Sequence, residues 1–188
     1  MLNRLISIIA LAVVTLAVSP ARADEYSNTI AIFQNAGQSG KFFPSAYGYA
    51  VFPTIVSGAF IVGGAHGDGR VYTQGKVVGG TTMTQASVGL QIGGQGYSEI
   101  VFFQDERAFR EFSSGNFEFG AGAQAVVVTA AAQAQTTTGG SSAGASASNK
   151  DAATAGDYYK GMATFVVAKG GLMAGVSVGG QKFTYNPM

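Results

Sequence analysis

The sequence predicts an α+β fold: a strongly curved antiparallel β-sheet, or barrel-like sandwich, with an N-terminal amphipathic helix and one short internal helix. Three observations favour this fold. Short apolar runs alternate with turn signals about every 8 to 12 residues, as in sandwiches and barrels. Glycine makes up 28 of 188 residues, and glycine inside strands is typical of bends in curved sheets. With 47% hydrophobic and only 11% charged residues, the chain can bury a substantial core.

Residues 1–23 have the three parts of a cleavable signal peptide. Arg4 provides the positive charge, residues 5–18 (LISIIALAVVTLAV) form the apolar segment, and residues 21–23 (ARA) have the small-x-small pattern of a cleavage site. The alternative, a membrane anchor, would require roughly 20 apolar residues. We therefore predict cleavage after Ala23 and an exported protein, periplasmic or secreted, whose single domain spans residues 24–188.

The mature chain is nearly neutral and contains no cysteine. Without Arg4 and Arg22, nine basic and ten acidic residues remain. This balance argues against nucleic acid as a partner, because nucleic-acid surfaces depend on many Lys and Arg contacts with phosphate. The absence of cysteine from the sequence excludes disulfides, cysteine nucleophiles, cysteine-ligated metals and a lipid-modified N-terminal cysteine.

The first element of the mature chain is predicted to be an amphipathic helix over residues 24–38. Tyr26, Ile30 and Phe33 recur at steps of three and four and therefore share one face. Such a helix could insert into a lipid interface, but these helices usually have a basic polar face, and only Lys41 lies near this one. We expect the helix to pack as a lid on the β-domain instead.

The remaining elements are read from periodicity and turn residues. Asp105 is the expected N-cap of a short helix over residues 106–112, whose Phe109 and Phe112 would pack inward. Residues 133–156 are small and polar and are predicted to form a flexible low-complexity loop. Pro53 is expected to end the first strand. Strands are expected over residues 46–53, 58–67, 70–80, 82–95, 97–104, 116–132 and, in two or three pieces, 158–185, with turns at 67–69, 74–75 and 95–96.

Few residues suggest catalysis or a cofactor. His66 is the sole histidine; it could act as a base or a ligand, but its glycine neighbours predict a turn. Residues 120–125 (GAGAQA) match a loose dinucleotide fingerprint, yet the valines after them favour a strand where the fingerprint needs a helix. We therefore predict no catalytic residue, no metal site and no cofactor; a hydrolase that uses His66 remains the enzymatic alternative.

Five cations are candidates for contacts with phosphate headgroups: Lys41, Arg70, Lys76, Lys169 and Lys182. Several of them stand beside glycines, where exposed backbone N–H groups could assist anion binding. The other interpretation, favoured for each residue taken singly, is ordinary solubility charge at loop tips.

Three segments together resemble the bacterial branch of the SYLF domain family. They are residues 46–72 (AYGYAVFPTIVSGAFIVGGAHGDGRVY), 87–112 (SVGLQIGGQGYSEIVFFQDERAFREF) and 164–185 (TFVVAKGGLMAGVSVGGQKFTY). The resemblance extends over roughly residues 27–186 and preserves the order and spacing of the segments.

The resemblance implies a lipid-binding domain. Eukaryotic members bind phosphoinositides and, in fungi, actin or actin regulators, through a basic N-terminal segment, whereas residues 24–40 here contain no Lys or Arg. We therefore expect a non-enzymatic exported protein that associates with phospholipid, another amphiphile or a membrane surface, and no actin binding. The alternative is a cell-envelope structural or interaction module without a lipid ligand, pairing with an envelope protein or with itself.

Overall fold

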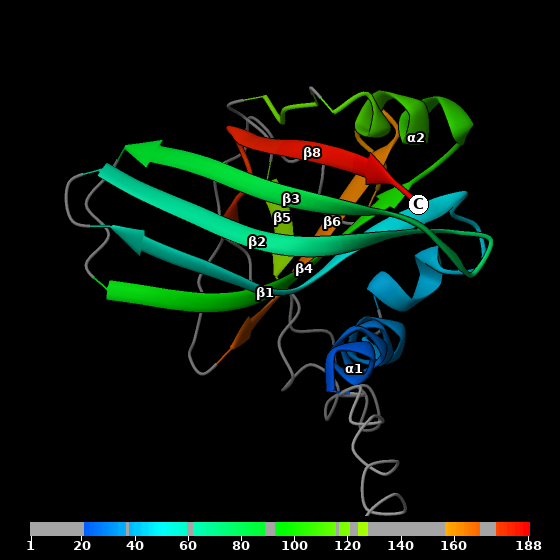
Figure 1. Ribbon diagram of the computed structural model, residues 1–188, viewed down its shortest axis with the longest axis horizontal. Coiled ribbons are helices and arrows are strands. Elements are labelled where there is room, and N and C mark those ends of the chain that lie inside the picture. The colour runs from blue at the N-terminus through cyan, green and yellow to red at the C-terminus, as the bar shows by residue number, and fades with distance from the viewer. Residues whose placement is uncertain are drawn as a thin grey trace, which may run out of the picture.

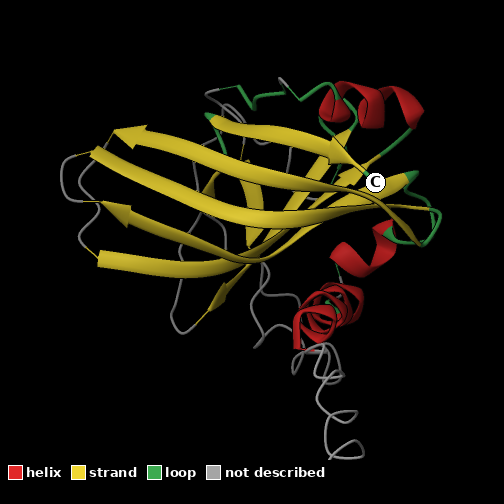
Figure 2. Ribbon diagram, in the orientation of Figure 1, coloured by secondary structure: helices red, strands yellow, loops and turns green. Residues whose placement is uncertain are grey.

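The chain folds around one large β-sheet with helices on both of its faces (Figures 1 and 2). The computed structural model describes residues 21–36, 38–59, 62–88, 93–115, 117–120, 124–127, 157–169 and 176–188. The predicted loop over residues 133–156 and the first 20 residues of the predicted signal peptide lie outside this description. The elements are α1 (Ala21–Asn35), the 3₁₀ helix η2 (Ser39–Phe42), β1 (Gly48–Ala59), β2 (Val62–Thr73), β3 (Lys76–Val88), β4 (Gly93–Phe103), α2 (Glu106–Ser113), β5 (Gln124–Val127), β6 (Met162–Lys169), β7 (Val176–Ser177) and β8 (Gln181–Pro187).

The α+β class is confirmed, but the sheet is mixed and open. The 8 strands follow the order β7-β5-β6-β4-β1-β2-β3-β8, and β5 pairs with β6 in parallel while the other pairs are antiparallel. The expectation of an antiparallel, barrel-like sandwich is therefore corrected. The long connection between β5 and β6 permits a parallel crossover, and the strands at the two ends of the order, β7 and β8, are not paired with each other.

The predicted strong curvature is confirmed by contacts across one face of the sheet. Gln181 on β8 donates from Nε2 to Oε2 of Glu99 on β4 over 3.0 Å, although three strands separate β8 from β4 in the sheet order. The rings of Phe52 on β1 and Phe183 on β8 lie 5.7 Å apart. We call this concave side the inner face and the opposite, convex side the outer face.

Each face has its own apolar core. On the inner face, α2 packs Ala108 and Phe112 against a cluster that includes Phe52 and Phe183. On the outer face, α1 packs Phe33 against a second cluster with Phe102 and Phe165. Phe33 is 0% exposed, so the prediction that the N-terminal helix forms a lid on the β-domain is confirmed. The expected cleavage point after Ala23 falls in the first turn of this helix.

The short helix forms as predicted. Asp105 has extended backbone angles and its side chain accepts a hydrogen bond from the backbone N–H of Ala108, 2.8 Å away, which satisfies one of the free N–H groups at the helix start. The predicted turn at residues 74–75 is also confirmed, since Gln74 and Gly75 have φ values of 51° and 75° and join β2 to β3.

Three other predictions, one strand end and two turns, were wrong. Pro53 does not end a strand: it lies inside β1, where the pairing register shifts between Val51 and Thr54, and such a bulge accommodates a residue without an N–H. Residues 67–69 lie within β2, and residues 95–96 lie within β4. The glycines at positions 67, 69 and 96 therefore lie inside strands and do not mark reversals of the chain.

The reason is close packing over the inner face. A Cβ atom added at Gly69 would lie 2.6 Å from two ring carbons of Phe52 and 2.9 Å from the carbonyl oxygen of Val51. Glycine therefore makes room for the aromatic side chain of the neighbouring strand on the inner face.

This packing leads to a first prediction. Gly69→Ala is expected to lower the free energy of unfolding by about 1 to 3 kcal/mol, because it overfills a packed core. The matched control is Gly80→Ala on β3, where an added Cβ meets nothing within 4 Å. Urea unfolding of the two variants checks the prediction, and equal midpoints would contradict it.

Candidate functional site

The N-terminal end of α1 is bound to the outer face of the sheet by polar contacts. The hydroxyl of Thr54 on β1 donates to the Glu25 carboxylate over 2.8 Å. Lys169 at the end of β6 donates to the same hydroxyl oxygen over 2.6 Å and lies 3.6 Å from the carboxylate. These contacts place the first turns of α1 over β1 and β6.

Beyond this point the outer face is not covered by α1. Strands β1 to β4 extend well past the helix on the left of Figure 1. Val56, two residues after Thr54 and on the same face, is 63% exposed, whereas Ile55 between them is 0% exposed and belongs to the inner core.

Val56 belongs to a row of directly paired residues that crosses six strands. Directly paired residues project from the same face of a sheet, so this row, which we call the outer row, forms one strip of the outer face. It spans five strand spacings, or about 24 Å. The outer row consists of Lys169, Gly96, Val56, His66, Thr84 and Lys182.

The strip beside the outer row has almost no side chains. Gly94, Gly58, Gly64 and Ala86 are paired in register across β4, β1, β2 and β3, and the last three of them are exposed. The outer face at this end is convex and carries few large side chains in its described part. The exposed Val56 lies near the middle of the row, and a lysine lies at each end.

The structure places two of the five predicted headgroup cations at the two ends of one row. Lys169 and Lys182 end the outer row, and Lys182 is exposed. Arg70 is also on the outer face, but its guanidinium carbon lies 4.2 Å from the centre of the Tyr26 ring on α1, a cation–π contact that helps to hold the helix.

The other two candidates lie apart from the row. Lys76 opens β3 at the hairpin with β2, eight residues or about 26 Å along the strand from Thr84. Lys41 is in the last turn of η2, the short helix that follows α1. The sequence did not distinguish these two from the lysines of the outer row, because cross-strand register is a tertiary property.

The sequence predicted a turn at His66, but the structure places this residue on β2, where it is exposed and belongs to the outer row. Its neighbour on the same face, Asp68, accepts a hydrogen bond from the Thr82 hydroxyl over 3.2 Å. Among the described residues, no three His, Cys, Asp or Glu side chains gather closely enough to hold a metal ion. Residues 120–125 lead into β5 and not into a helix, so the dinucleotide fingerprint is not met.

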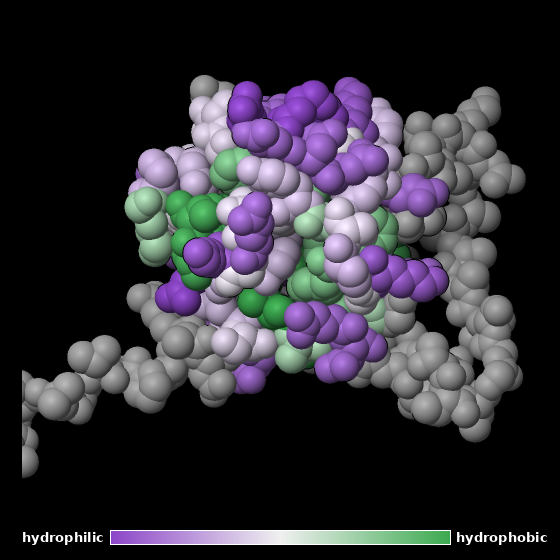
Figure 3. All heavy atoms as spheres, turned by 90° about the vertical axis from the view of Figure 1, so that its right-hand side faces the viewer, coloured by the Kyte–Doolittle hydropathy of each residue, from purple (hydrophilic) through white to green (hydrophobic). Residues whose placement is uncertain are grey.

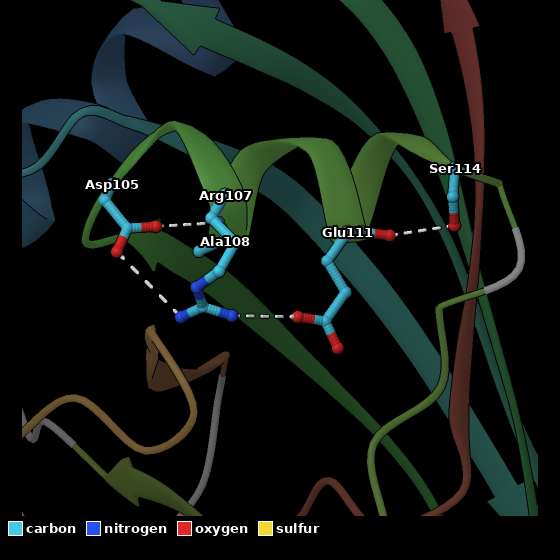
Figure 4. Close-up of polar contacts among 5 residues, drawn as sticks. All are labelled: Asp105, Arg107, Ala108, Glu111 and Ser114. Atoms are coloured by element: carbon cyan, nitrogen blue, oxygen red, sulfur yellow. Dashed lines mark hydrogen bonds and ion pairs between the residues drawn. The ribbon is translucent and has the colours of Figure 1, made fainter.

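The carboxylates of α2 form surface ion pairs. Arg107 lies 3.9 Å from Asp105 and 3.3 Å from Glu111 (Figure 4), and Arg110 lies 2.6 Å from Glu106. Figure 3 shows the resulting hydrophilic surface at the top of the molecule. Paired acids of this kind are neutralised in part by their i,i+4 partners, and these acids lie on the solvated face of the helix.

Sequence reasoning missed a buried polar cluster on the inner face. Glu99 and Gln181 are 0% exposed and Tyr97 is 2% exposed. Burial raises the pKa of Glu99 to about 8, against the smaller opposing effect of the Gln181 hydrogen bond. Burial, and secondarily the Glu99 charge, raises the pKa of the Tyr97 phenol. A signal was present, since Glu99 alternates with Tyr97 and Val101 on the apolar, inward-facing side of its strand.

Comparison with known families assigns the chain. Residues 84–187 match the sequence model of a family described as Ysc84, the Las17-binding protein actin regulator. The chain belongs to the Ysc84 (SYLF) family. A comparison with curated proteins finds no match. The part of the SYLF chain that matches contains both outer-row lysines and the buried Glu99 and Gln181, whereas α1, β1 and β2 precede it. In the part of this SYLF domain that the structure describes, no helix is both long and apolar enough to cross a membrane.

Proposed function

We propose that this SYLF protein is a non-enzymatic exported protein that binds the surface of phospholipid membranes. The observation that carries the proposal is the outer row on the convex face: an exposed Val56 between Lys182 and Lys169. Lys169 also forms an ion pair with Glu25 of α1. Membership of the SYLF family supports it, since lipid binding is what the resemblance implies. Actin is not a partner in this proposal, because residues 24–40 carry no Lys or Arg.

The mechanism is electrostatic attraction followed by shallow apolar contact. Each lysine near an anionic bilayer surface contributes about 1 kcal/mol, and the strip of glycine and alanine beside the outer row allows the backbone to approach the headgroups closely. The valine adds a small apolar contact with the interface. Two lysines together predict weak, salt-sensitive and reversible association, without any covalent step.

Co-sedimentation with vesicles of phosphatidylethanolamine and phosphatidylglycerol tests this proposal. The double variant Lys169→Gln/Lys182→Gln is expected to lower the partition constant about 10- to 30-fold, the equivalent of about 2 kcal/mol. The matched control, Lys41→Gln/Lys76→Gln, removes the same charge from positions outside the outer row and is expected to change binding by less than about threefold.

Two outcomes would contradict the proposal in different ways. Equal losses in both double variants would mean that net charge, and not the outer row, drives binding. No sedimentation of the native protein with any vesicle would overturn lipid binding itself. In the latter case a stable, lipid-independent assembly detected by light scattering would favour the alternative function, a structural module of the cell envelope.

A further inference from the structure

Glu99 and Gln181 each leave one oxygen without a partner inside the sheet. Nε2 of Gln181 donates to Oε2 of Glu99 over 3.0 Å. The remaining Oε1 atoms of both side chains are buried and accept no hydrogen bond from the described part of the chain. Buried oxygens without partners are rare in folded proteins and unfavourable, so this arrangement requires an explanation.

A proton on Glu99 would supply a donor for these oxygens, beside the Tyr97 hydroxyl, which is also buried without a hydrogen-bond partner in the described part of the chain. An ionised carboxylate and an amide oxygen can only accept hydrogen bonds, so the two Oε1 atoms cannot bond to each other in that state. A protonated carboxylic acid gains one O–H donor. An O–H group on Oε1 of Glu99 can donate to Oε1 of Gln181, while the N–H of Gln181 donates to Oε2 of Glu99. The acid and the amide then form a closed pair with two hydrogen bonds.

We propose that Glu99 is a neutral carboxylic acid in the folded protein, and that its acid–amide pair with Gln181 is a pH-sensitive clasp that holds β8 against β4 across the inner face. Ionisation of Glu99 removes the donor and breaks one of the two hydrogen bonds. This inference is independent of the proposed lipid binding, since both residues lie on the face opposite to the outer row.

The surroundings of Glu99 favour the neutral form. The residues paired with it on the neighbouring strands are Phe52 on β1 and Val166 on β6, both 0% exposed. The titratable side chains of the described inner face are Tyr97, on the same strand, and Tyr185 on β8, which donates to the carbonyl oxygen of Val78. In this described surrounding no Lys, Arg or His faces the carboxyl group, so no cation compensates a negative charge there.

The clasp matters because β8 is a terminal strand. On one side β8 pairs with β3. On its other side the described contacts are an isolated β-bridge between Glu118 and Lys182 and backbone hydrogen bonds from the residues next to Glu118. Three strands separate β8 from β4 in the sheet order. The curl of the open sheet therefore depends on side-chain contacts across the inner face, and the Glu99–Gln181 hydrogen bond joins β8 directly to β4 across it.

The direction of the pH effect follows from the two protonation equilibria. In the unfolded chain the pKa of Glu99 is near its ordinary value of 4.5, and burial raises it to about 8 in the folded protein. The stabilisation by the neutral acid is complete below the lower value and is lost as the pH rises toward the higher one. Within this window the unfolding equilibrium constant should rise up to about tenfold per pH unit.

Urea unfolding of the full mature chain at pH 5, 6.5 and 8 tests the clasp. Glu99→Gln keeps one donor and one acceptor for Gln181 and cannot ionise. We expect it to match the native protein at pH 5 and to lose the pH dependence described above. The control Glu118→Gln removes an exposed carboxyl group and should follow the native protein. Parallel pH profiles of Glu99→Gln and the native protein, or a large loss of stability of Glu99→Gln at pH 5, would overturn the proposal.

Infrared spectroscopy gives an independent reading of the proton. The difference spectrum between the native protein and Glu99→Gln at pH 6 should contain the C=O stretch of a protonated carboxylic acid, and a carboxylate band in its place would refute a neutral Glu99. If Glu99→Gln does not fold, Gln181→Glu keeps the clasp testable, because two facing acids need two protons. Its stability should then fall more steeply with rising pH than that of the native protein, and an unchanged slope would count against the clasp.

Discussion

Replacing Phe183 with alanine is expected to lower the free energy of unfolding by about 3 to 5 kcal/mol, the range for truncating a buried phenylalanine. Phe183 on β8 is 0% exposed. Its ring lies 5.0 Å from Phe112 on α2, 5.7 Å from Phe52 on β1, and 5.7 and 6.1 Å from Phe119 and Phe117. The substitution would leave a cavity where β8, α2 and the opposite wall of the curled sheet meet.

Urea denaturation followed by tyrosine fluorescence or circular dichroism measures this loss. The neighbouring Thr184 is exposed on the other face of the same strand, so Thr184→Ala serves as the control and should change stability by less than about 0.5 kcal/mol. If both variants lost the same amount of unfolding free energy, the role of Phe183 at the centre of the inner-face core would be contradicted.

Phe33→Ala is expected to weaken the docking of α1 by about 3 to 5 kcal/mol. Phe33 is the fully buried aromatic residue of this helix and packs over the outer cluster with Phe102 and Phe165. Ile32, the preceding residue, is 42% exposed, so Ile32→Ala is a matched control on the same helix and should have little effect. Hydrogen exchange of the α1 amides measures the difference.

Loss of α1 docking should also expose the aromatic surface beneath it. Phe42 stacks on Phe102 at 5.4 Å and meets Phe165 edge-on at 5.1 Å, and the helix shields this cluster from water. A dye that reports exposed apolar surface should therefore bind Phe33→Ala more strongly than Ile32→Ala. Unchanged exchange and dye binding in Phe33→Ala would show that other contacts, such as those of Glu25 and Arg70, hold the helix by themselves.

Several structural features of this protein could be predicted from local sequence patterns alone. Asp105 was recognised as an N-cap and Gln74-Gly75 as a turn, because each depends on backbone groups within a few positions of the chain. Phe109 and Phe112 were placed inward on the short helix by periodicity alone, and both pack against the inner core. The lid position of α1 also followed from its apolar face and its lack of basic residues.

Other residues were misread because their roles depend on distant partners. Gly67 and Gly69 look like a turn in the sequence, but they face Ile55 and Phe52 on the next strand. Pro53 looks like a strand end, yet a bulge places it within a central strand. Lys169 and Lys182 could not be separated from Lys41 and Lys76, because only the pairing of six strands places the first two in one row.

The sequence by itself determined the α+β class, the two helices, the strand-rich middle of the chain and the family, since these depend on local periodicity, capping and ordered motifs. Only the tertiary structure decided the open mixed sheet, its curl, the uncovered outer row and the buried Glu99–Gln181 pair. These features depend on strand register and on contacts between residues as far apart in the chain as Glu99 and Gln181, and local pattern carries no information about such distances. Close packing on the inner face likewise depends on glycines of one strand that admit side chains of the next, as Gly69 admits Phe52.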